Sequence, residues 1–514
     1  MTHSSDIKTI GIWFGFPHEV AIKREGINRY TYNLVLNLMK SHDVNCEIWC
    51  YSENYAKLTK QFEAILTDAK YGSRLKVITE RNFDVHFPDS KLRVPRVTKE
   101  AILAAPPELR SQKLSWIANL ASEADRMIVP IIHLENALHL RMPTLVALHD
   151  LVIVEFLDSF LKYDSNAQTH ASTVLRIVEE FSKKGAFFCS NSDFVRKEHL
   201  QRYAKNIQNE STDFVYLPVI LPQDLETRLP SKKALSEKFN LPEKYIFIPT
   251  QIRPYKNIET AVSALGELRE EGVDIKLVLT GTPNSEVDQL IRENHLESAV
   301  VLTGDLSEYE LYAFHKFAVA TVVPSLFEGG FPWQGLEAMA MGTPAIMAKI
   351  PVTLERLQFL GFDPQTCGLS LFEPQNVGDL VSQIKQVLSD RAQIVTQQEK
   401  IKSELLKYTW KEAGERYFQI LNTKMQSSPV TREDRSKKQL VELKRILFWK
   451  TLKPRLKRIP VLSKVLTWIY QLVKMPGRVA ENRDLNILIH SQLNQYQEKI
   501  NTLQARIDQL QFKK

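Results

Sequence analysis

The chain has 514 residues, an apolar fraction of 44% and a formal net charge of +7. This length suggests about three domains, and the apolar content is sufficient for packed cores, so a wholly disordered chain is excluded. Its four cysteines, Cys46, Cys50, Cys189 and Cys367, have neither the density of a disulfide framework nor the spacing of a zinc site. We expect buried free thiols in a reducing compartment.

Targeting segments are not evident in the sequence. Residues 1–6 lack the basic start of a signal peptide, and the apolar run that follows is short enough to be a strand. A helix needs about 20 apolar residues to cross a bilayer, and no uninterrupted apolar stretch of the sequence is that long. We therefore expect a cytoplasmic protein.

The first elements predict an α/β domain. Residues 7–14 read as a buried strand, and residues 30–39 as a helix with a regular apolar stripe. The loop between them contains Glu25 and Gly26. Residues 128–130 and 143–154 give two further strands, and His149 and Asp150 sit at the end of the second. A lone histidine after a strand is usually a structural residue.

Further strand-to-helix turns follow along the chain. Residues 189–192 lead into a helix over 194–203, and residues 216–219 lead into an interdomain linker. Beyond the linker, residues 245–249 form a strand and residues 258–268 an amphipathic helix. Strand and helix alternate through residues 245–400, which predicts a parallel, doubly wound sheet.

Arg253 and Lys256 lie in the loop after the strand at 245–249, where open α/β sheets bind ligands. Two cations three residues apart can neutralise a diphosphate, because arginine gives a forked contact and lysine a point charge. Taken alone, such a pair is more often two solvated loop cations.

The most informative segment runs from Glu328 to Ile346 and reads EGGFPWQGLEAMAMGTPAI. A strand over 318–323 precedes it, and a helix over 336–341 is closed by Gly342 and Pro344. Glycines before a helix allow backbone N–H groups to approach an anion. Two carboxylates, Glu328 and Glu337, can accept hydrogen bonds from sugar hydroxyls. The combination predicts a site for a nucleotide sugar, although Glu337 could also stabilise a helix N-terminus and the glycines could form a plain turn.

This segment resembles the donor-site signature of retaining glycosyltransferases of family 4, the glycosyl transferases group 1 with the GT-B fold. The two glutamates are nine positions apart where the family usually has eight, so we infer a one-residue loop insertion. The resemblance covers about residues 7–425. It implies two Rossmann-like doubly wound domains facing across a cleft, and a retaining, metal-independent hexosyltransferase. It also implies that Gly26 stands where the family often has Gly-Gly, with Glu25 replacing the first glycine.

The resemblance assigns roles to individual residues. His149 would reach towards the transferred sugar, Arg253 and Lys256 would clamp the phosphates, and Glu337 would bind the ribose. The expected catalytic residues are His149, Glu328, Arg253 and Lys256. The expected donor-binding residues are Gly26, Arg253, Lys256, Gly329, Gly330, Phe331 and Glu337. No metal and no cofactor are expected.

We expect an N-terminal acceptor-side domain over 1–225 and a nucleotide-sugar-binding domain over 226–405. Over 406–430 we expect a crossover helix that packs back on the N-terminal domain.

Residues 431–480 carry 14 Lys and Arg against 3 Asp and Glu, a net charge of +11, interleaved with large apolar residues. Such a basic amphipathic segment suggests peripheral membrane contact at the inner face of the cell membrane, although a solvated packing helix or a nucleic-acid patch has the same composition. No nucleic-acid partner is expected.

The last residues, 481–514, show a heptad pattern of apolar residues that predicts a coiled coil and a homo-oligomer through 485–510.

Three functions are consistent with these sequence features. The first is a membrane-associated glycosyltransferase that extends a glycan or lipid-linked acceptor in cell-surface polysaccharide or glycolipid synthesis. The second is another enzyme of the same fold, such as a nucleotide-sugar epimerase or a soluble sucrose- or glycogen-type synthase. The third is a non-catalytic, membrane-associated scaffold.

Overall fold

The computed structural model describes residues 7–16, 26–86, 110–204, 206–222, 224–281, 284–425, 433–435, 437–439 and 441–442. The chain divides into two compact units, Met1–Gln439 and Leu440–Lys514, and the fold below is that of the first unit. The predicted coiled coil over 481–514, and nearly all of the basic segment over 431–480, lie outside the described residues. Within the described residues, no helix is long and apolar enough to span a membrane.

The N-terminal half is built on a seven-stranded parallel sheet with the order β3-β2-β1-β4-β5-β6-β7. Its strands are buried runs rich in β-branched and aromatic residues, as expected for strands covered on both faces. The strands are β1 (Thr9–Phe14), β2 (Asn45–Cys50), β3 (Leu75–Ile78), β4 (Arg126–Val129), β5 (Thr144–Leu148), β6 (Phe187–Ser190) and β7 (Thr212–Phe214).

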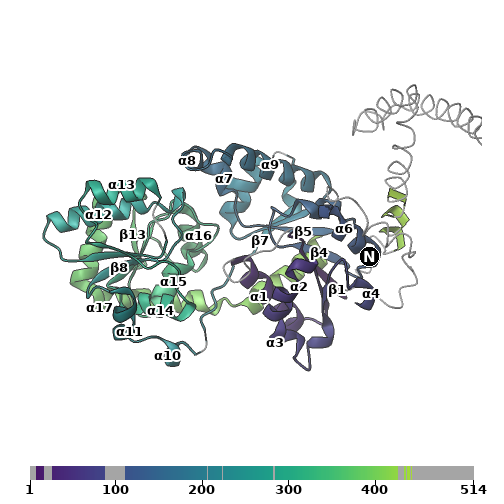
Figure 1. The fold of residues 1–514 in the computed structure, drawn as a ribbon, viewed down its shortest axis with the longest axis horizontal. Helices are drawn as coiled ribbons and strands as arrows, with labels where there is room; N and C mark the ends of the chain where they lie inside the picture. The colour runs from purple at the N-terminus through teal and green to yellow at the C-terminus, as the bar shows by residue number, and fades with distance from the viewer. Residues whose placement is uncertain are drawn as a thin grey trace, which may run out of the picture. The chain divides into compact units, whose positions relative to one another are not determined.

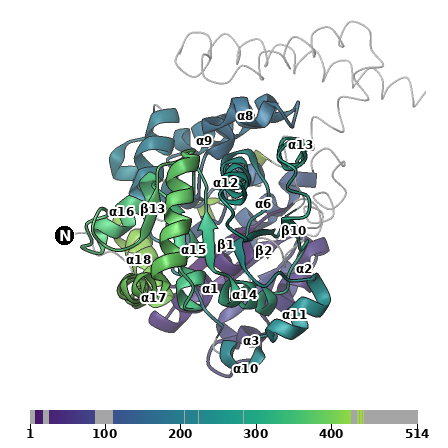
Figure 2. The same ribbon diagram turned by 90° about the vertical axis from the view of Figure 1, so that its left-hand side faces the viewer.

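Helices connect these strands and cover the sheet (Figures 1 and 2). They are α1 (Gly26–Ser41), α2 (Ser52–Gln61), α3 (Glu63–Leu66), α4 (Phe83–His86), α6 (Arg110–Ala121), α7 (Val152–Glu155), α8 (Leu157–Leu161) and α9 (Ala167–Lys183), followed by a π-helical segment at Val195–Gln201. Cys46, Cys50 and Cys189 are buried free thiols of this half, as predicted, whereas Cys367 of the C-terminal half is a free thiol that is only partly buried.

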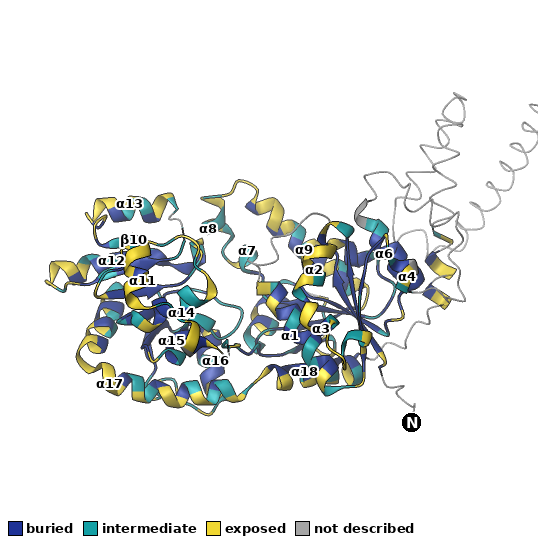
Figure 3. Ribbon diagram, turned by 60° about the horizontal axis from the view of Figure 1, so that its bottom comes forward, coloured by how far each residue is buried: buried dark blue, intermediate teal, exposed yellow. Residues whose placement is uncertain are grey.

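The C-terminal half is built on a six-stranded parallel sheet with the order β10-β9-β8-β11-β12-β13. Its strands are β8 (Tyr245–Ile248), β9 (Lys276–Leu279), β10 (Val300–Leu302), β11 (Ala320–Val323), β12 (Ala345–Ala348) and β13 (Ser370–Phe372). Its helices are α10 (Leu225–Arg228), α11 (Lys232–Phe239), α12 (Ile258–Glu270), α13 (Ser285–Glu293), α14 (Glu308–Phe317), α15 (Trp333–Ala340), α16 (Pro351–Phe359) and α17 (Val377–Lys407). Figure 3 shows the strands as the buried layer and the outward helix faces as exposed.

The first six strands of each sheet have the same order when each sheet is numbered from its own start, and the N-terminal sheet adds β7 at its edge. In both, the first strand lies between the second and the fourth, which is the arrangement of the Rossmann fold. The chain therefore reverses its direction of winding twice, between β1 and β4 and between β8 and β11. The predicted fold class of two Rossmann-like, doubly wound domains is confirmed.

Several boundaries differ from the sequence prediction. The strand predicted over 143–154 ends at Leu148, and helix α7 begins at Val152, because apolar periodicity cannot separate a strand from a short helix that continues it. The helix predicted from 30 begins at Gly26, and the helix predicted from 336 begins at Trp333. In both cases the first turn contains a glycine, Gly26 or Gly335, which is a poor helix former, so the sequence pattern marks only the turns that follow it.

Helix α18 (Trp410–Gln419) returns from the C-terminal domain to the N-terminal one. Its Trp410, Ala413 and Tyr417 belong to the same buried cluster as Tyr30 and Leu34 of α1. The hydroxyl of Tyr30 donates to that of Tyr417 at 2.9 Å, inside this cluster. A capping box formed by Thr409 and Glu412 fixes the start of the helix.

The first residues of the basic segment pack against protein. Arg435 and Gln439 are almost wholly buried. Arg435 donates to the backbone carbonyls of Ser122 and Ala124, and Gln439 accepts from the side chain of Asn119 at 2.8 Å. The expectation of a membrane-facing segment from residue 431 is therefore wrong for these residues, because their polar groups bind the end of α6.

Candidate active site

The loops that follow β8 and β11 lie at the switch point of the C-terminal sheet, where ligands bind in open α/β folds. The first loop contains Arg253 and Lys256, and the second contains Glu328. Asn257 adopts a left-handed conformation with φ of 53°, which ends the turn at Pro254–Lys256 and starts α12. Its side-chain amide donates to the carbonyl of Pro324 at 3.0 Å, and the N–H of Leu326 donates to the carbonyl of Tyr255 at 2.8 Å. These bonds hold the two loops together.

Lys256 and Glu328 form an ion pair across these loops. Nζ of Lys256 lies 2.5 Å from Oε1 of Glu328, and both side chains are largely buried. The hydroxyl of Ser325 donates to the same carboxylate oxygen at 2.8 Å. Arg253 lies differently, because its side chain is exposed and donates to Oε1 of Gln251 at 2.9 Å. The predicted pair of cations is thus one buried, engaged lysine and one exposed arginine.

The glycine loop after Glu328 lies against the N-terminal domain. A side-chain carbon at Gly329 would come within 2.5 Å of the backbone oxygen of His149, so only glycine fits without movement. The carbonyl of Gly329 accepts a hydrogen bond from the hydroxyl of Ser192 at 2.9 Å. Among the described residues, no hydrogen bond uses the N–H groups of Gly329, Gly330 and Phe331. These donors are available to an anion beside the N-terminus of α15.

Glu337 occupies the second turn of α15, because that helix begins at Trp333. A carboxylate this far into a helix gains little from the helix dipole, so stabilisation of the N-terminus does not explain it. The side chain is buried: Tyr312 donates to it at 3.5 Å, and Nε2 of His315 lies 3.7 Å from Oε2. Helix α15 ends at Ala340, and Gly342, which follows two residues later with φ of 70°, closes it as the sequence predicted.

His149 follows β5 in the N-terminal domain. Its Nε2 lies 2.9 Å from the carbonyl oxygen of Pro130, and its Nδ1 lies 2.9 Å from Oδ1 of Asn191. Both partner oxygens only accept, so the ring donates to one or both of them according to which of its nitrogens carries a proton. The ring also packs edge-to-face on Tyr30, with centroids 5.1 Å apart. The imidazole is therefore fixed in orientation, and neither nitrogen can bond a sugar without losing a protein partner.

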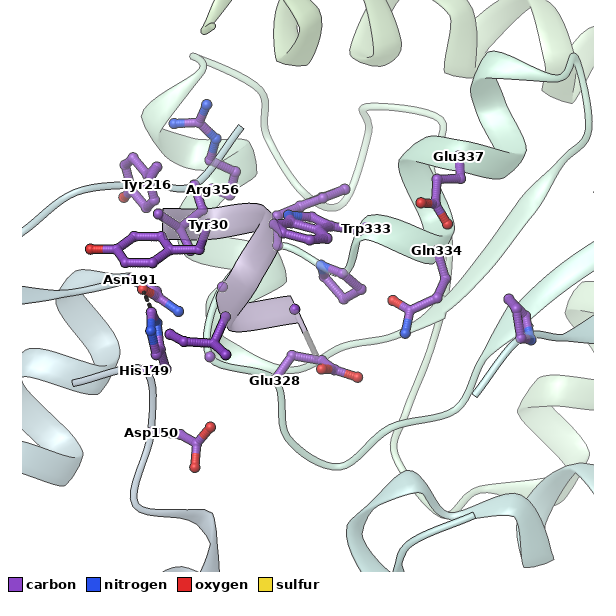
Figure 4. A pocket seen from close by; sticks show the side chains of 18 of the residues that line it. Tyr30, His149, Asp150, Asn191, Tyr216, Glu328, Trp333, Gln334, Glu337 and Arg356 are labelled. Atoms are coloured by element: carbon purple, nitrogen blue, oxygen red, sulfur yellow. Dashed lines mark hydrogen bonds between the residues drawn. The ribbon is translucent and has the colours of Figure 1, made fainter. Parts of the chain in front are cut away.

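A cavity of about 490 Å³ brings these groups together. Figure 4 shows Glu328, Gln334 and Glu337 from the C-terminal domain, and His149, Asp150 and Asn191 from the other domain. The lining includes Gly26, Ile27, Tyr30, Ile131, His149, Asp150, Asn191, Tyr216, Leu217, Pro249, Leu311, Glu328, Gly329, Gly330, Phe331, Pro332, Trp333, Gln334, Glu337 and Arg356.

Most of the predicted site residues line this cavity, but the two predicted cations do not. Lys256 is one contact away, through its ion pair with Glu328, whereas Arg253 points to Gln251. Asn191, Tyr216 and Arg356 line the cavity without having been predicted. Asn191 could have been inferred from its place directly after a strand, but Tyr216 and Arg356 are brought in only by the tertiary fold. In the part of the chain that the structure describes, no cluster of three or more His, Cys, Asp or Glu side chains could hold a metal ion.

Two Rossmann-like domains with a cavity between them constitute the GT-B fold. Sucrose-phosphate synthase from Thermosynechococcus elongatus shares this fold, with a TM-score of 0.54 and 20% identity over 80% of this chain and 98% of that one. Residues 231–404 match the family model described as glycosyl transferases group 1. Over these residues of the C-terminal domain, the resemblance to glycosyl transferases group 1 that the sequence indicated is confirmed.

Curated relatives match over part of their length. The MMP alpha-(1->4)-mannosyltransferase of Mycolicibacterium hassiacum is 30% identical over 142 residues, which are 27% of this chain and 33% of the relative. The serotype-specific mannosyltransferase WbdA of Escherichia coli is 25% identical over 206 residues, which are 39% of this chain and 24% of the relative. The matches thus span between a quarter and a third of these relatives.

Proposed function

We propose that the protein is a retaining, metal-independent glycosyltransferase that moves a hexose from a nucleotide sugar to a glycan or lipid-linked acceptor. The observation that carries this proposal is the cavity that joins Glu328, Gly329, Gly330 and Glu337 to the opposite domain. It combines carboxylates for hydroxyl groups with unused N–H donors for phosphate, which is the chemistry that a nucleotide sugar requires.

The donor would lie along the start of α15. Glu337 would accept hydrogen bonds from the ribose hydroxyls, and the N–H groups of Gly329 and Gly330 would donate to the diphosphate. Lys256 lies behind Glu328 and would share its charge between that carboxylate and the phosphate. Arg253 is exposed at the end of the same loop and would turn from Gln251 to the phosphate, where a guanidinium makes a forked contact.

Transfer would depend on stabilising the leaving phosphate. Negative charge grows on that phosphate as the glycosidic bond breaks, and preorganised N–H groups and cations aimed at it lower the barrier. The acceptor hydroxyl would pass its proton to the leaving phosphate oxygen on the same face of the sugar, which accounts for retention. His149, held by Asn191 and Pro130, would form the fixed wall beside the transferred sugar. Gly26 would leave room between phosphate and acceptor, since nothing lies within 4 Å of a side-chain carbon built there.

The acceptor class is proposed from the relatives and from the tail. Mannosyltransferases, one of them serotype-specific, are among the relatives, so we infer a role in cell-surface polysaccharide or glycolipid synthesis. The basic residues after Gln439 would bring the enzyme to the inner face of the cell membrane, and residues 485–510 would pair two copies.

Thermal unfolding of the full chain with UDP, GDP and ADP tests the donor site. A nucleotide at about 100 times its dissociation constant adds about 2.7 kcal/mol of stability, so the correct one raises the Tm clearly. The shift is expected to vanish in Glu337→Ala and to shrink in Arg253→Ala. Arg292→Ala, which removes an exposed arginine from α13, is the matched control and keeps the full shift.

Product analysis tests the reaction itself. With the nucleotide sugar identified in this way, the anomeric configuration of the product by NMR reports retention, and activity in excess EDTA reports metal independence. Nucleotide binding without sugar transfer to any glycan or lipid-linked acceptor would favour the scaffold function instead.

A further inference from the structure

A second cavity, of about 500 Å³, lies where helix α18 crosses back to the N-terminal domain. One wall is aromatic and comes from Phe214 at the end of β7, Tyr216 just beyond it, Phe359 at the end of α16, and Tyr408 just before α18. The other wall is the polar face of α18, which contributes Lys411, Glu412, Glu415, Arg416 and Gln419. Concave sites of this size with aromatic walls and a few polar groups are typical of small-ligand sites.

The aromatic wall is more exposed than core packing requires. Phe359 is 61% exposed, although it stands edge-to-face on Tyr216 with centroids 5.0 Å apart. Tyr216 makes a similar contact with Phe214 at 5.3 Å. The exposed face of Phe359 adds apolar surface to the cavity, and no other side chain in the described part of the chain covers it.

Arg356 fixes this wall from behind. Its guanidinium carbon lies 4.3 Å from the ring centroid of Tyr216, 5.0 Å from that of Tyr408 and 5.3 Å from that of Phe359. The hydroxyl of Tyr216 donates to Oε1 of Glu355 at 2.7 Å. Rings held by a buried cation and a hydrogen bond lose little freedom when a ligand stacks on them, so the wall is preorganised.

The polar wall carries no net charge. It carries two cations, Lys411 and Arg416, and two anions, Glu412 and Glu415, all from α18. Arg416 is paired with Asp213 at 2.8 Å, and Glu415 with His42 at 3.0 Å. A neutral wall with both donors and acceptors suits hydroxyl groups rather than a phosphate or an ammonium. A ligand with an apolar face and a rim of hydroxyls fits between the two walls, and a pyranose ring has this form.

We propose that this cavity binds a pyranose unit of the glycan acceptor, at a distance from the unit that receives the new sugar. Tyr216 lines both this cavity and the proposed donor cavity, so one bound glycan would be continuous between them. The inference rests on the proposed function, because it takes its occupant from the transfer reaction. It adds a second, non-reacting subsite that selects acceptors longer than one unit.

Direct glycan binding tests the proposal. The full chain is applied to immobilised oligosaccharides of mannose, glucose and N-acetylglucosamine, from one to six units long, with and without UDP, GDP and ADP. We expect binding that strengthens with length and that weakens about tenfold in Phe359→Ala, a loss typical of truncating an aromatic contact. Tyr55→Ala, which removes another exposed aromatic ring, on α2 and outside both cavities, is the control and binds as the wild type does.

Kinetics give a second readout. In Phe359→Ala the KM for the longest acceptors rises about tenfold, whereas kcat and the KM for the shortest accepted glycan stay unchanged. The proposal is overturned if no glycan binds, or if Phe359→Ala and Tyr55→Ala behave alike. Nucleotide-induced Tm shifts measured on the same samples separate the two failures. If nucleotide raises the Tm but no glycan binds, only the second subsite is rejected. If nucleotide does not raise the Tm and no glycan binds, the proposed function is rejected as well.

Discussion

Lys256 and Glu328 form a largely buried ion pair, 2.5 Å long, between the two loops at the switch point of the C-terminal sheet. One residue comes from the loop after β8 and the other from the loop after β11, so the pair joins segments 72 positions apart in the chain. Together with Ser325 it fixes the carboxylate before any donor is present.

Lys256→Met is therefore expected to destabilise the protein. The substitution leaves the Glu328 carboxylate buried without its cation. Removing one partner of a buried ion pair typically lowers the free energy of unfolding by about 3 kcal/mol. Lys256→Met/Glu328→Gln removes both charges and is expected to recover most of the Tm while remaining inactive. Differential scanning fluorimetry of the four proteins of this cycle measures the coupling. If the Tm loss of the double variant equals the sum of the losses in Lys256→Met and Glu328→Gln, the two residues are not coupled and the pair contributes nothing to the fold.

Gly329 provides a test of the contact between the domains. Gly329→Ala places a carbon 2.5 Å from the backbone oxygen of His149, so the loop or the neighbouring domain must move. We expect a lower Tm and a loss of transfer of about 100-fold, since misplacement of reacting groups by about 1 Å can cost that much.

Gly330→Ala is the matched control for this change. A side-chain carbon at Gly330 meets its nearest neighbour, the backbone oxygen of Asn191, at an ordinary distance of 3.6 Å. Its Tm is expected to stay that of the wild type. A lower Tm in Gly330→Ala than in Gly329→Ala would contradict the arrangement of this loop.

The sequence was sufficient to predict the two doubly wound domains, because their strands are continuous apolar runs with glycine or polar residues at the ends. It also placed Glu328 and Glu337 on either side of the glycine loop, since that segment is local in the chain. It could not place Arg253, whose position depends on which acceptor its long side chain finds. Tyr216 and Arg356 were missed because they enter the cavity only through packing between segments far apart in the chain.

His315 is expected to act as a positioning residue for Glu337. It is fully buried, its Nδ1 lies 2.8 Å from the hydroxyl of Thr321, and its Nε2 faces the Glu337 carboxylate at 3.7 Å. His315→Ala is expected to raise the KM for the donor about tenfold with little change in kcat, because ribose binding is lost equally from ground and transition states.

His315→Gln is the conservative control, since its amide can reach towards the same carboxylate. We expect it to recover part of the nucleotide affinity measured by calorimetry. If Ala and Gln variants bind nucleotide as tightly as the wild type, Glu337 needs no such support.

The last prediction concerns pH and His199. Its Nδ1 accepts a hydrogen bond from the N–H of Leu151 at 2.9 Å, and its ring stacks on Phe327 with centroids 4.6 Å apart. Burial lowers the pKa of His199 below its usual value, and the charges of Asp150 and Glu155 oppose this only in part. The folded protein therefore holds the neutral ring, and the unfolded chain binds the proton more readily.

The stability from this histidine is thus fully present above the unfolded pKa of about 6.5 and is lost as the pH falls below it towards the folded-state pKa. We expect the Tm to fall between pH 7.5 and pH 5.5, and to fall less in His199→Asn. The asparagine carbonyl can still accept from Leu151, but it does not titrate in this range. Burial also lowers the pKa of His133, so His133→Asn is a second variant whose smaller pH dependence should add to the first. Identical pH dependence in the wild type and His199→Asn would mean that the ring is protonated as easily in the fold as outside it.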